Sequence, residues 1–232
     1  MRPALSMPVL QEAMAYSRIE RLTPMPKKPQ RPLIWIPIIH SQADLGNMRE
    51  QVRNLYVRKM GRAKWRQHVQ TVDRMWREIR TGVEALALDY GKVRLYQDGL
   101  PNCGHEPQIV RDLAQAGSEN HRLLLDLMEK GAKITGTESP EFLLEEYELA
   151  QQVLVSADSR GAGTRRPVQS DLGKRILEKR DRYIAERIGQ TLRAGETGLV
   201  FLGMLHSLVG HLPADVQMVR LDEARQSARQ KK

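Results

Sequence analysis

Two histidines follow the apolar runs that most clearly predict buried strands. His206 follows the run at residues 199–202, and Gly203 marks the end of that predicted strand. His40 follows the run at residues 33–39, which is rich in isoleucine and typical of a strand buried on both faces. Ligands of open α/β sheets bind at the carboxyl ends of the strands, so both imidazoles are candidates for chemistry. Taken alone, a histidine in such a place is more often a hydrogen-bonded structural residue.

Two acids follow other predicted strands in the same way. Asp98 comes two positions after a strand predicted at residues 92–96, and Glu138 comes directly after one predicted at residues 132–137. For Glu138 alone, the simpler interpretation is charge complementation of the N-terminus of the next helix, worth a few tenths to about 1 kcal/mol. If the strands are parallel, however, the histidines and acids converge on one edge of the sheet.

Two imidazoles and two carboxylates suit Zn²⁺, Mn²⁺, Fe²⁺ or Co²⁺, with one coordination position left open for water. The candidate metal ligands are His40, Asp98, Glu138 and His206. Such an ion lowers the pKa of its bound water, and Asp98 or Glu138 would then handle the proton. These residues predict a metal-dependent hydrolase that acts on a small molecule or a peptide.

A further candidate lies in the long helix predicted at residues 171–192, where Arg180 and Asp181 are adjacent. Neighbouring positions on a helix point about 100° apart. We therefore expect one of the two to face the site and the other to make a flanking ion pair. If Arg180 faces the site, it would stabilise an oxyanion or a substrate carboxylate.

These residues also resemble the motifs of a known group of proteins. A strand that ends in His40 before a serine, an Arg180–Asp181 pair in a long helix, and the ending Gly203-x-x-His206 are similar to the TraB/Tiki/ChaN-like superfamily. The segments IPIIHSQADLG, YQDGLP, GTESPEFLLEEY and FLGMLH look like a group of bacterial proteins in or near it. The resemblance implies an α/β core whose strand-end histidines and acids form a site. Members are described as metalloproteases, haem-binding lipoproteins or esterase-like enzymes.

The sequence departs from the pattern of the superfamily at two places. Ile38 and Ile39 replace the glycine and threonine before the first histidine, and the acid after the second strand must be matched to Asp98, beside Gln97. Both departures weaken the transfer of metalloprotease activity. A non-catalytic protein that binds haem or another small ligand through the same histidines is therefore the alternative.

The charge of the chain suggests a third function. The formal net charge is +9, and residues 49–80 carry ten basic residues against three acidic ones. The apolar spacing across residues 45–88 predicts two helices, separated at Gly61, with Asp44 as the N-cap. A basic helical face binds phosphates, which favours nucleic acid as a partner, although a solvated face whose arginine stems cover apolar surface is the simpler interpretation. Trp65 and Trp76 are expected to pack rather than stack on bases.

The pattern as a whole predicts an α/β fold with a central, mostly parallel sheet flanked by helices, in which the long basic helices follow the first strand. We expect a basic, proline-containing extension at residues 1–31, one α/β domain at residues 32–221, and a polar, charged, frayed tail at residues 222–232. The Gly/Ser/Arg-rich residues 156–170 are expected to form a loop, and residues 216–221 the final strand.

Several classes of protein are disfavoured by composition. The single cysteine, Cys103, cannot form an internal disulfide or a cysteine-based zinc cluster, and a lone cysteine is usually incidental rather than a nucleophile. No apolar run is long enough to span a membrane, and the N-terminus does not resemble a signal peptide, which together predict a cytoplasmic protein. A Gly-x-Ser-x-Gly motif is also absent, which disfavours a serine hydrolase. The oligomeric state stays open.

Overall fold

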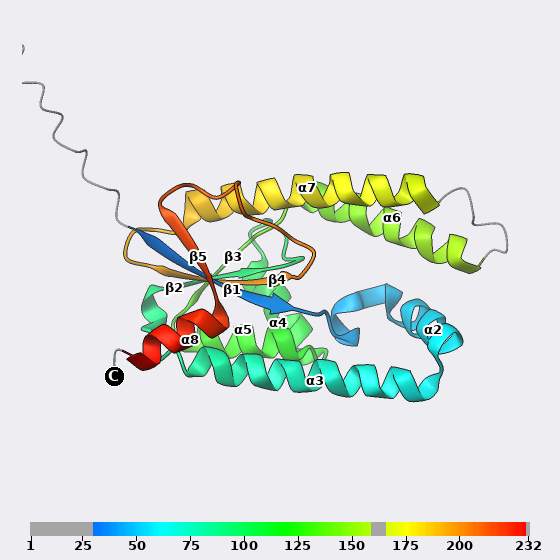
Figure 1. Cartoon of the computed structure of the whole chain (residues 1–232), viewed down its shortest axis with the longest axis horizontal. Coiled ribbons are helices and arrows are strands. Elements are labelled where there is room, and N and C mark those ends of the chain that lie inside the picture. Colours follow the sequence, from blue (N-terminus) through cyan, green and yellow to red (C-terminus); the bar gives the residue numbers. More distant parts are fainter. Residues whose placement is uncertain (1–29, 159–165, 231–232) are drawn as a thin grey trace, which may run out of the picture.

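The computed structural model describes residues 30–158 and 166–230, which form a mixed α/β fold (Figure 1). Its centre is a five-stranded sheet in the order β3-β2-β4-β1-β5, and every neighbouring pair is parallel. The strands are β1 (Arg31–Ile38), β2 (Val93–Gln97), β3 (Lys133–Thr135), β4 (Thr197–Gly203) and β5 (Val216–Arg220). The predicted fold class is confirmed.

Seven α-helices and two short 3-10 helices surround the sheet within the described residues. The 3-10 helices are η1 (Gln42–Met48) and η2 (Tyr90–Lys92). The α-helices are α2 (Arg49–Met60), α3 (Arg62–Glu84), α4 (Glu106–Gln115), α5 (Glu119–Glu129), α6 (Pro140–Asp158), α7 (Arg166–Thr191) and α8 (Leu221–Gln230). The predicted break between the two basic helices is confirmed, because Gly61 has a φ of 86° that favours glycine.

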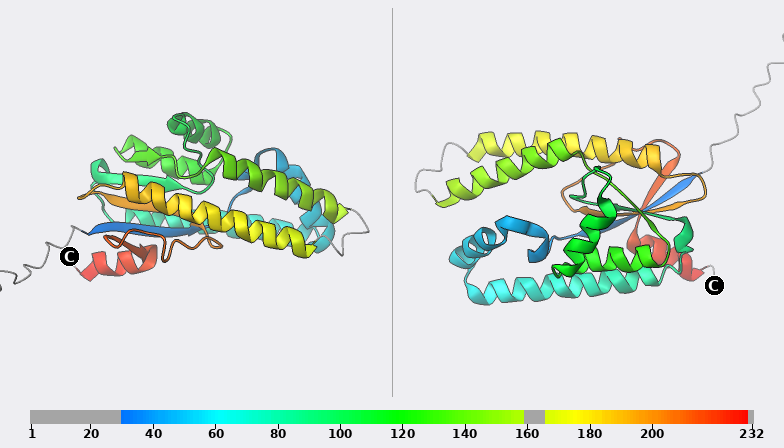
Figure 2. Two further views of the ribbon diagram at one scale, coloured as in Figure 1. Left: turned by 90° about the horizontal axis from the view of Figure 1, so that it is seen from above. Right: turned by 180° about the vertical axis from the view of Figure 1, so that it is seen from behind.

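The apolar strands bury both of their faces, and the side chains of the two faces belong to two separate hydrophobic clusters. In β4, Leu199 and Phe201 pack with α3 and α5, whereas Val200 and Leu202 pack with α7. Successive strand residues point to opposite faces, so a continuous apolar run is what a sheet covered on both sides requires. Figure 2 shows the resulting layers, with α3, α5 and α8 on one side of the sheet and α7 on the other.

Pro37 sits in a central strand without removing a needed hydrogen bond between β1 and β5. The β1–β5 pairs end at Trp35, whereas the pairs between β1 and β4 continue through Pro37. Pro37 is the last but one residue of β1. The sequence-based expectation that this proline lies near the end of its strand is confirmed.

Two helical arms extend past the carboxyl ends of the strands. One arm is α2 with the first turns of α3, and the other is the outer half of the α6–α7 pair (Figure 1, Figure 2). Within the described residues, no helix is long and apolar enough to cross a membrane.

Two expectations about connections need correction. Residues 222–230 belong to helix α8 instead of a frayed tail, because Leu221 and Ala224 pack on the core and Leu221 lies against Gly82 of α3. The predicted loop at 156–170 is shorter, since α6 continues to 158 and α7 begins at 166; residues 159–165 lie outside the described part. Residues 1–29, where an N-terminal extension is predicted, also lie outside the described part.

Candidate functional site

The four predicted site residues meet at the carboxyl edge of the sheet. Glu138 follows β3, Asp98 follows β2, His206 lies three residues after β4, and His40 lies two residues after β1. The strand order therefore brings them to the edge in the sequence Glu138, Asp98, His206, His40. Asp98, Glu138 and His206 are buried, whereas the His40 side chain is 39% exposed. The predicted convergence agrees with this geometry.

Asp98 is the centre of the cluster. Its Oδ2 accepts a hydrogen bond from the backbone N–H of Gly203 at 2.9 Å and lies 3.3 Å from His40 Nε2. Its Oδ1 accepts from Arg180 at 2.7 Å and lies 3.5 Å from His206 Nε2. Burial alone would raise the pKa of Asp98, but the two histidines outweigh it and hold the pKa well below its usual value. The carboxylate is therefore ionised at neutral pH.

Gly203 makes the approach of Asp98 to β4 feasible. A Cβ at this position would lie 3.0 Å from Asp98 Oδ2 and 3.6 Å from the His206 ring. A larger residue would push the carboxylate away from the strand, and the hydrogen bond from the Gly203 N–H would be strained. The Gly-x-x-His spacing thus has a steric reason in this site.

His206 is held between two acids. Its Nδ1 lies 2.6 Å from Asp181 Oδ1, and the other oxygen of Asp181 accepts a hydrogen bond from the Ser207 N–H at 3.0 Å. Burial lowers the pKa of the ring, but Asp181 and Asp98 more than compensate and raise the pKa of His206 to about 9. The ring is therefore protonated at neutral pH and can donate a proton.

Arg180 joins the acids of three different elements. Its guanidinium contacts Glu138 through two hydrogen bonds of 3.0 and 2.6 Å, Asp98 at 2.7 Å and Glu146 of α6 at 2.6 Å. Burial raises the pKa of Glu138 in spite of these bonds, which also keep Arg180 charged. Because its donors are already engaged by carboxylates, Arg180 acts here as a positioning residue.

Arg180 faces the acids of the site and Asp181 makes an ion pair with His206 beside them, which is the division expected for this adjacent pair. Both side chains are buried, at 3% and 6% exposure, and both contact site residues. Helix α7 lies over the edge of the sheet, so adjacent positions reach different partners: Arg180 reaches the ends of β2 and β3, while Asp181 reaches the segment after β4. Neither the contact between Asp181 and His206 nor the contact of Glu146 with Arg180 could be predicted from the spacing of these residues.

A second polar cluster lies next to His40 in the chain. Asp44 accepts hydrogen bonds from the N–H and Oγ of Ser41 at 2.7 and 2.8 Å, and from Ser118 Oγ at 2.5 Å. Ser118 Oγ also lies 2.8 Å from His121 Nδ1. The predicted N-cap role of Asp44 is wrong, because Ser41 is the N-cap and Asp44 completes its capping box, for which the Ser-x-x-Asp spacing was a usable signal. The cluster ties η1, and with it the backbone beside His40, to α5.

His40 differs from His206 in its exposure. Burial lowers the pKa of His40, but its contact with Asp98 outweighs that effect and moves the pKa above the ordinary value of 6.5. The His40 side chain is the more exposed of the two, so solvent reaches it more easily than it reaches His206.

Each histidine borders a small cavity. The cavity beside His40 has a volume of about 190 Å³ and a polar lining that includes Ser41, Arg49 and His68. The cavity beside His206 has a volume of about 100 Å³ and an apolar lining that includes Trp35 and Met218. Both are smaller than the roughly 300–1,000 Å³ that encloses a drug-sized ligand, so each suits one small group of a larger molecule.

The donor atoms of the site residues decide whether a metal ion fits at this edge of the sheet. Asp98, Glu138 and His206 each offer one ligand atom within 4.8 Å of the others, and His40 is not a member of that group. The bond from Asp181 to His206 Nδ1 is the orientation that a metal-binding imidazole uses. However, Arg180 already bonds the carboxylates of Asp98 and Glu138, and its positive charge would repel a divalent ion. In this arrangement the residues do not fit a resident ion.

Comparisons with models of protein families, with curated proteins and with solved structures found no match for this chain. The resemblance to the TraB/Tiki/ChaN-like superfamily therefore stays a prediction.

Proposed function

We propose that this protein is a hydrolase-like enzyme whose reaction centre is the carboxyl edge of the sheet. The observation that carries the proposal is that two imidazoles share one buried carboxylate. His40 Nε2 and His206 Nε2 lie 3.3 and 3.5 Å from the two oxygens of Asp98. Two titratable groups in different environments can have different pKa values, which allows one to act as a general acid and the other as a general base.

The different surroundings of the two rings favour one assignment of roles. His40 is the candidate general base, because it is the more exposed ring and solvent water can reach it. His206, with a pKa raised to about 9, is the candidate general acid. In this scheme His40 removes a proton from a water molecule, the resulting hydroxide attacks the scissile carbonyl or phosphoryl group, and His206 protonates the leaving group.

The acids and the arginine support this scheme without touching the substrate. Asp98 orients both rings and stabilises the positive charge that His40 gains. Asp181 fixes the ring of His206 through Nδ1, so the proton given to the leaving group would come from Nε2, on the side of the ring that faces Asp98. Arg180 and Glu138 keep the Asp98 carboxylate in place, so the predicted catalytic roles of Glu138 and Arg180 become positioning roles in this proposal.

The two cavities indicate a substrate with chemically different ends. A polar group would enter the cavity beside His40, and a small apolar group would enter the one beside His206. Small esters or amides and short peptides combine such groups. The TraB/Tiki/ChaN-like assignment remains part of the proposal, supported by the fact that the residues behind the resemblance lie within one cluster.

A metal-dependent reaction is the second candidate, favoured by the group of Asp98, Glu138 and His206. It requires Arg180 to leave the carboxylates. Elemental analysis of the purified protein decides the matter: a near-stoichiometric Zn, Mn, Fe or Co that is lost in His206→Ala would replace the metal-free scheme. The haem alternative predicts a Soret band after growth with haem.

The hydrolase proposal is tested with a panel of chromogenic esters, amides and phosphate esters. We expect turnover of at least one class, with a pH profile that rises as His40 loses its proton and falls as His206 loses its own. His40→Gln and His206→Gln should each lower kcat/KM at least 100-fold, in the range typical of a lost general acid or base. The exposed His211 offers the matched control, and His211→Gln should leave the rate unchanged. Equal rates in all three variants would refute the proposal.

A further inference from the structure

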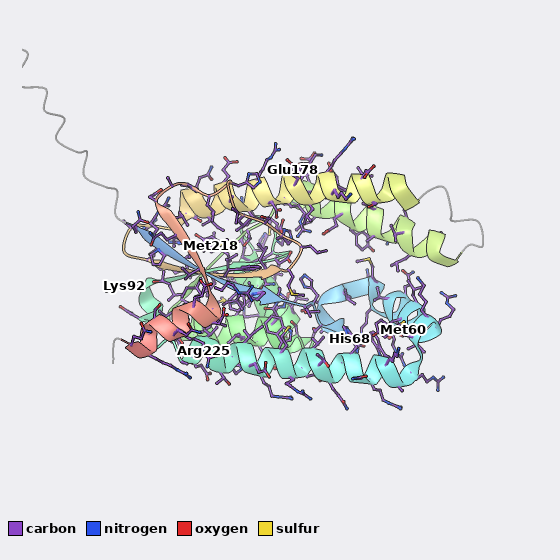
Figure 3. All side chains as sticks on the ribbon, in the orientation of Figure 1. Met60, His68, Lys92, Glu178, Met218 and Arg225 are labelled. Carbon is purple, nitrogen blue, oxygen red and sulfur yellow. The ribbon has the colours of Figure 1, made fainter. Side chains whose placement is uncertain are left out.

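The outward face of α3 carries arginines that the site does not use. Helix α3 buries one side, where Val72, Trp76, Ile79 and Val83 pack on the core, and Trp65 at its start packs on Tyr56 and His68. The exposed basic residues of the helix lie elsewhere on its surface. Figure 3 shows many α3 side chains directed away from the sheet, several with nitrogen at their tips.

Four of these residues form a continuous surface. Successive helix residues turn by about 100° and rise by about 1.5 Å, so these four occupy a sector of about 120° and a length of about 22 Å. We call this surface the arginine face; it consists of Arg62, Arg66, Arg74 and Arg77. One acid, Asp73, falls in the same sector, and it borders the cavity beside His40.

The arginine face has no neutralising partner. Among the described residues, none of its four guanidinium groups lies within 4 Å of an acid. Arg53 of α2, by contrast, pairs with Glu50, and Arg80 at the other end of α3 pairs with Asp126. Unpaired charges of one sign along a helix raise the local potential and attract a polyanion.

We propose that the arginine face binds the phosphate backbone of double-stranded nucleic acid. Duplex DNA carries one negative charge per roughly 1.7 Å of helix axis, so a surface about 22 Å long faces several phosphates at once. Arginine is also the side chain that bonds phosphate oxygens in a bidentate manner. The surface lies on a single rigid helix and needs no rearrangement to meet a straight duplex.

Two observations favour a duplex over other polyanions. The exposed large apolar side chains of the described residues lie on α2, α6, α7, β5 and the segment after β4, and none is on α3, so this helix has no apolar face to insert into a lipid surface. Trp65 and Trp76 of α3 are buried and are not free to stack on the bases of a single strand. The remaining contact is with phosphates, which predicts binding without sequence preference.

The test is fluorescence anisotropy of the full chain with a labelled 20-base-pair duplex at 50 and 200 mM salt. Two unrelated sequences should bind with equal affinity. Affinity should fall steeply with salt, and the triple variant Arg66→Glu, Arg74→Glu, Arg77→Glu should weaken binding at 50 mM at least 10-fold. Neutralising one residue, as in Arg74→Gln, should reduce the slope of log K against log salt by about 0.9.

Helix α7 provides a control with the same change in net charge. Lys174, Arg175 and Arg182 are exposed, and reversing all three to glutamate should change the affinity by less than 3-fold. An equal loss in both triple variants would show that net charge alone drives binding and would overturn the proposal. So would the absence of binding at 50 mM salt, or tighter binding to vesicles of phosphatidylserine and phosphatidylcholine than to the duplex.

Discussion

The contact between Asp181 and His206 makes a quantitative prediction about stability. The pKa of His206 is raised from 6.5 to about 9 in the folded protein. A rise of this size corresponds to about 3 kcal/mol of folding free energy. Because the folded pKa is the higher one, this stabilisation is fully present below pH 6.5 and is lost as the pH rises through 9.

Replacing Asp181 by asparagine removes the first acid that raises this pKa and leaves Asp98 as the second. We expect Asp181→Asn to lower the pKa of His206 by about one to two units, the usual effect of one opposite charge in contact. The unfolding free energy of the variant should then change less between pH 6.5 and 9. Asp171→Asn, an exposed substitution on the same helix, is the matched control.

Two measurements check this prediction. NMR titration of the His206 ring gives its pKa directly, and urea unfolding at pH 6.5, 8 and 9 gives the dependence of stability on pH. The reasoning is refuted if wild-type His206 titrates near 6.5, or if Asp181→Asn and Asp171→Asn give the same titration curve as the wild type.

Three further substitutions test the elements around the site, each by urea denaturation. Arg180→Met leaves two buried carboxylates without their partner and should cost about 3–5 kcal/mol; a loss below 1 kcal/mol would contradict this. The pKa of Asp44 is lowered to about 2 because its hydrogen bonds outweigh the effect of burial. The Asp44 carboxylate therefore contributes about 2 kcal/mol of stability above pH 4, and this contribution is lost as the pH falls towards 2. In Asp44→Asn the unfolding free energy should fall less between pH 4 and pH 2 than in the wild type. Gly136→Ala places a Cβ 2.5 Å from Asn102 Cα and should destabilise by about 1–3 kcal/mol, whereas Gly173→Ala in α7 meets only ordinary contacts and should not destabilise.

The strands and most helices were predictable because their signals are local. The apolar runs that form β1 and β4 require burial on both faces, and the two core clusters on opposite sides of the sheet show that burial. The edge of the sheet where His40, Asp98, Glu138 and His206 meet followed from strand ends alone.

The interactions within the cluster were not predictable, because they depend on where α7 crosses the sheet. Only that crossing brings Arg180 between Asp98 and Glu138 while Asp181 reaches His206. Helix α8 was missed for a similar reason. Its composition is polar, and its apolar Leu221 packs closely on α3 only because Gly82, which has no side chain, lies opposite it.

The strand order has a consequence for how the protein folds during synthesis. Strand β1 pairs only with β4 and β5, and β2 needs β4 on one of its sides. A nascent chain that has reached residue 196 can pair β2 with β3, but it holds β1 without any neighbour. Its apolar residues must therefore wait through the synthesis of more than 150 residues for a partner. Strand β1 is thus synthesised first, and the two strands that pair with it are synthesised last. A chaperone that covers β1 during translation would protect its apolar residues from aggregation until those strands appear.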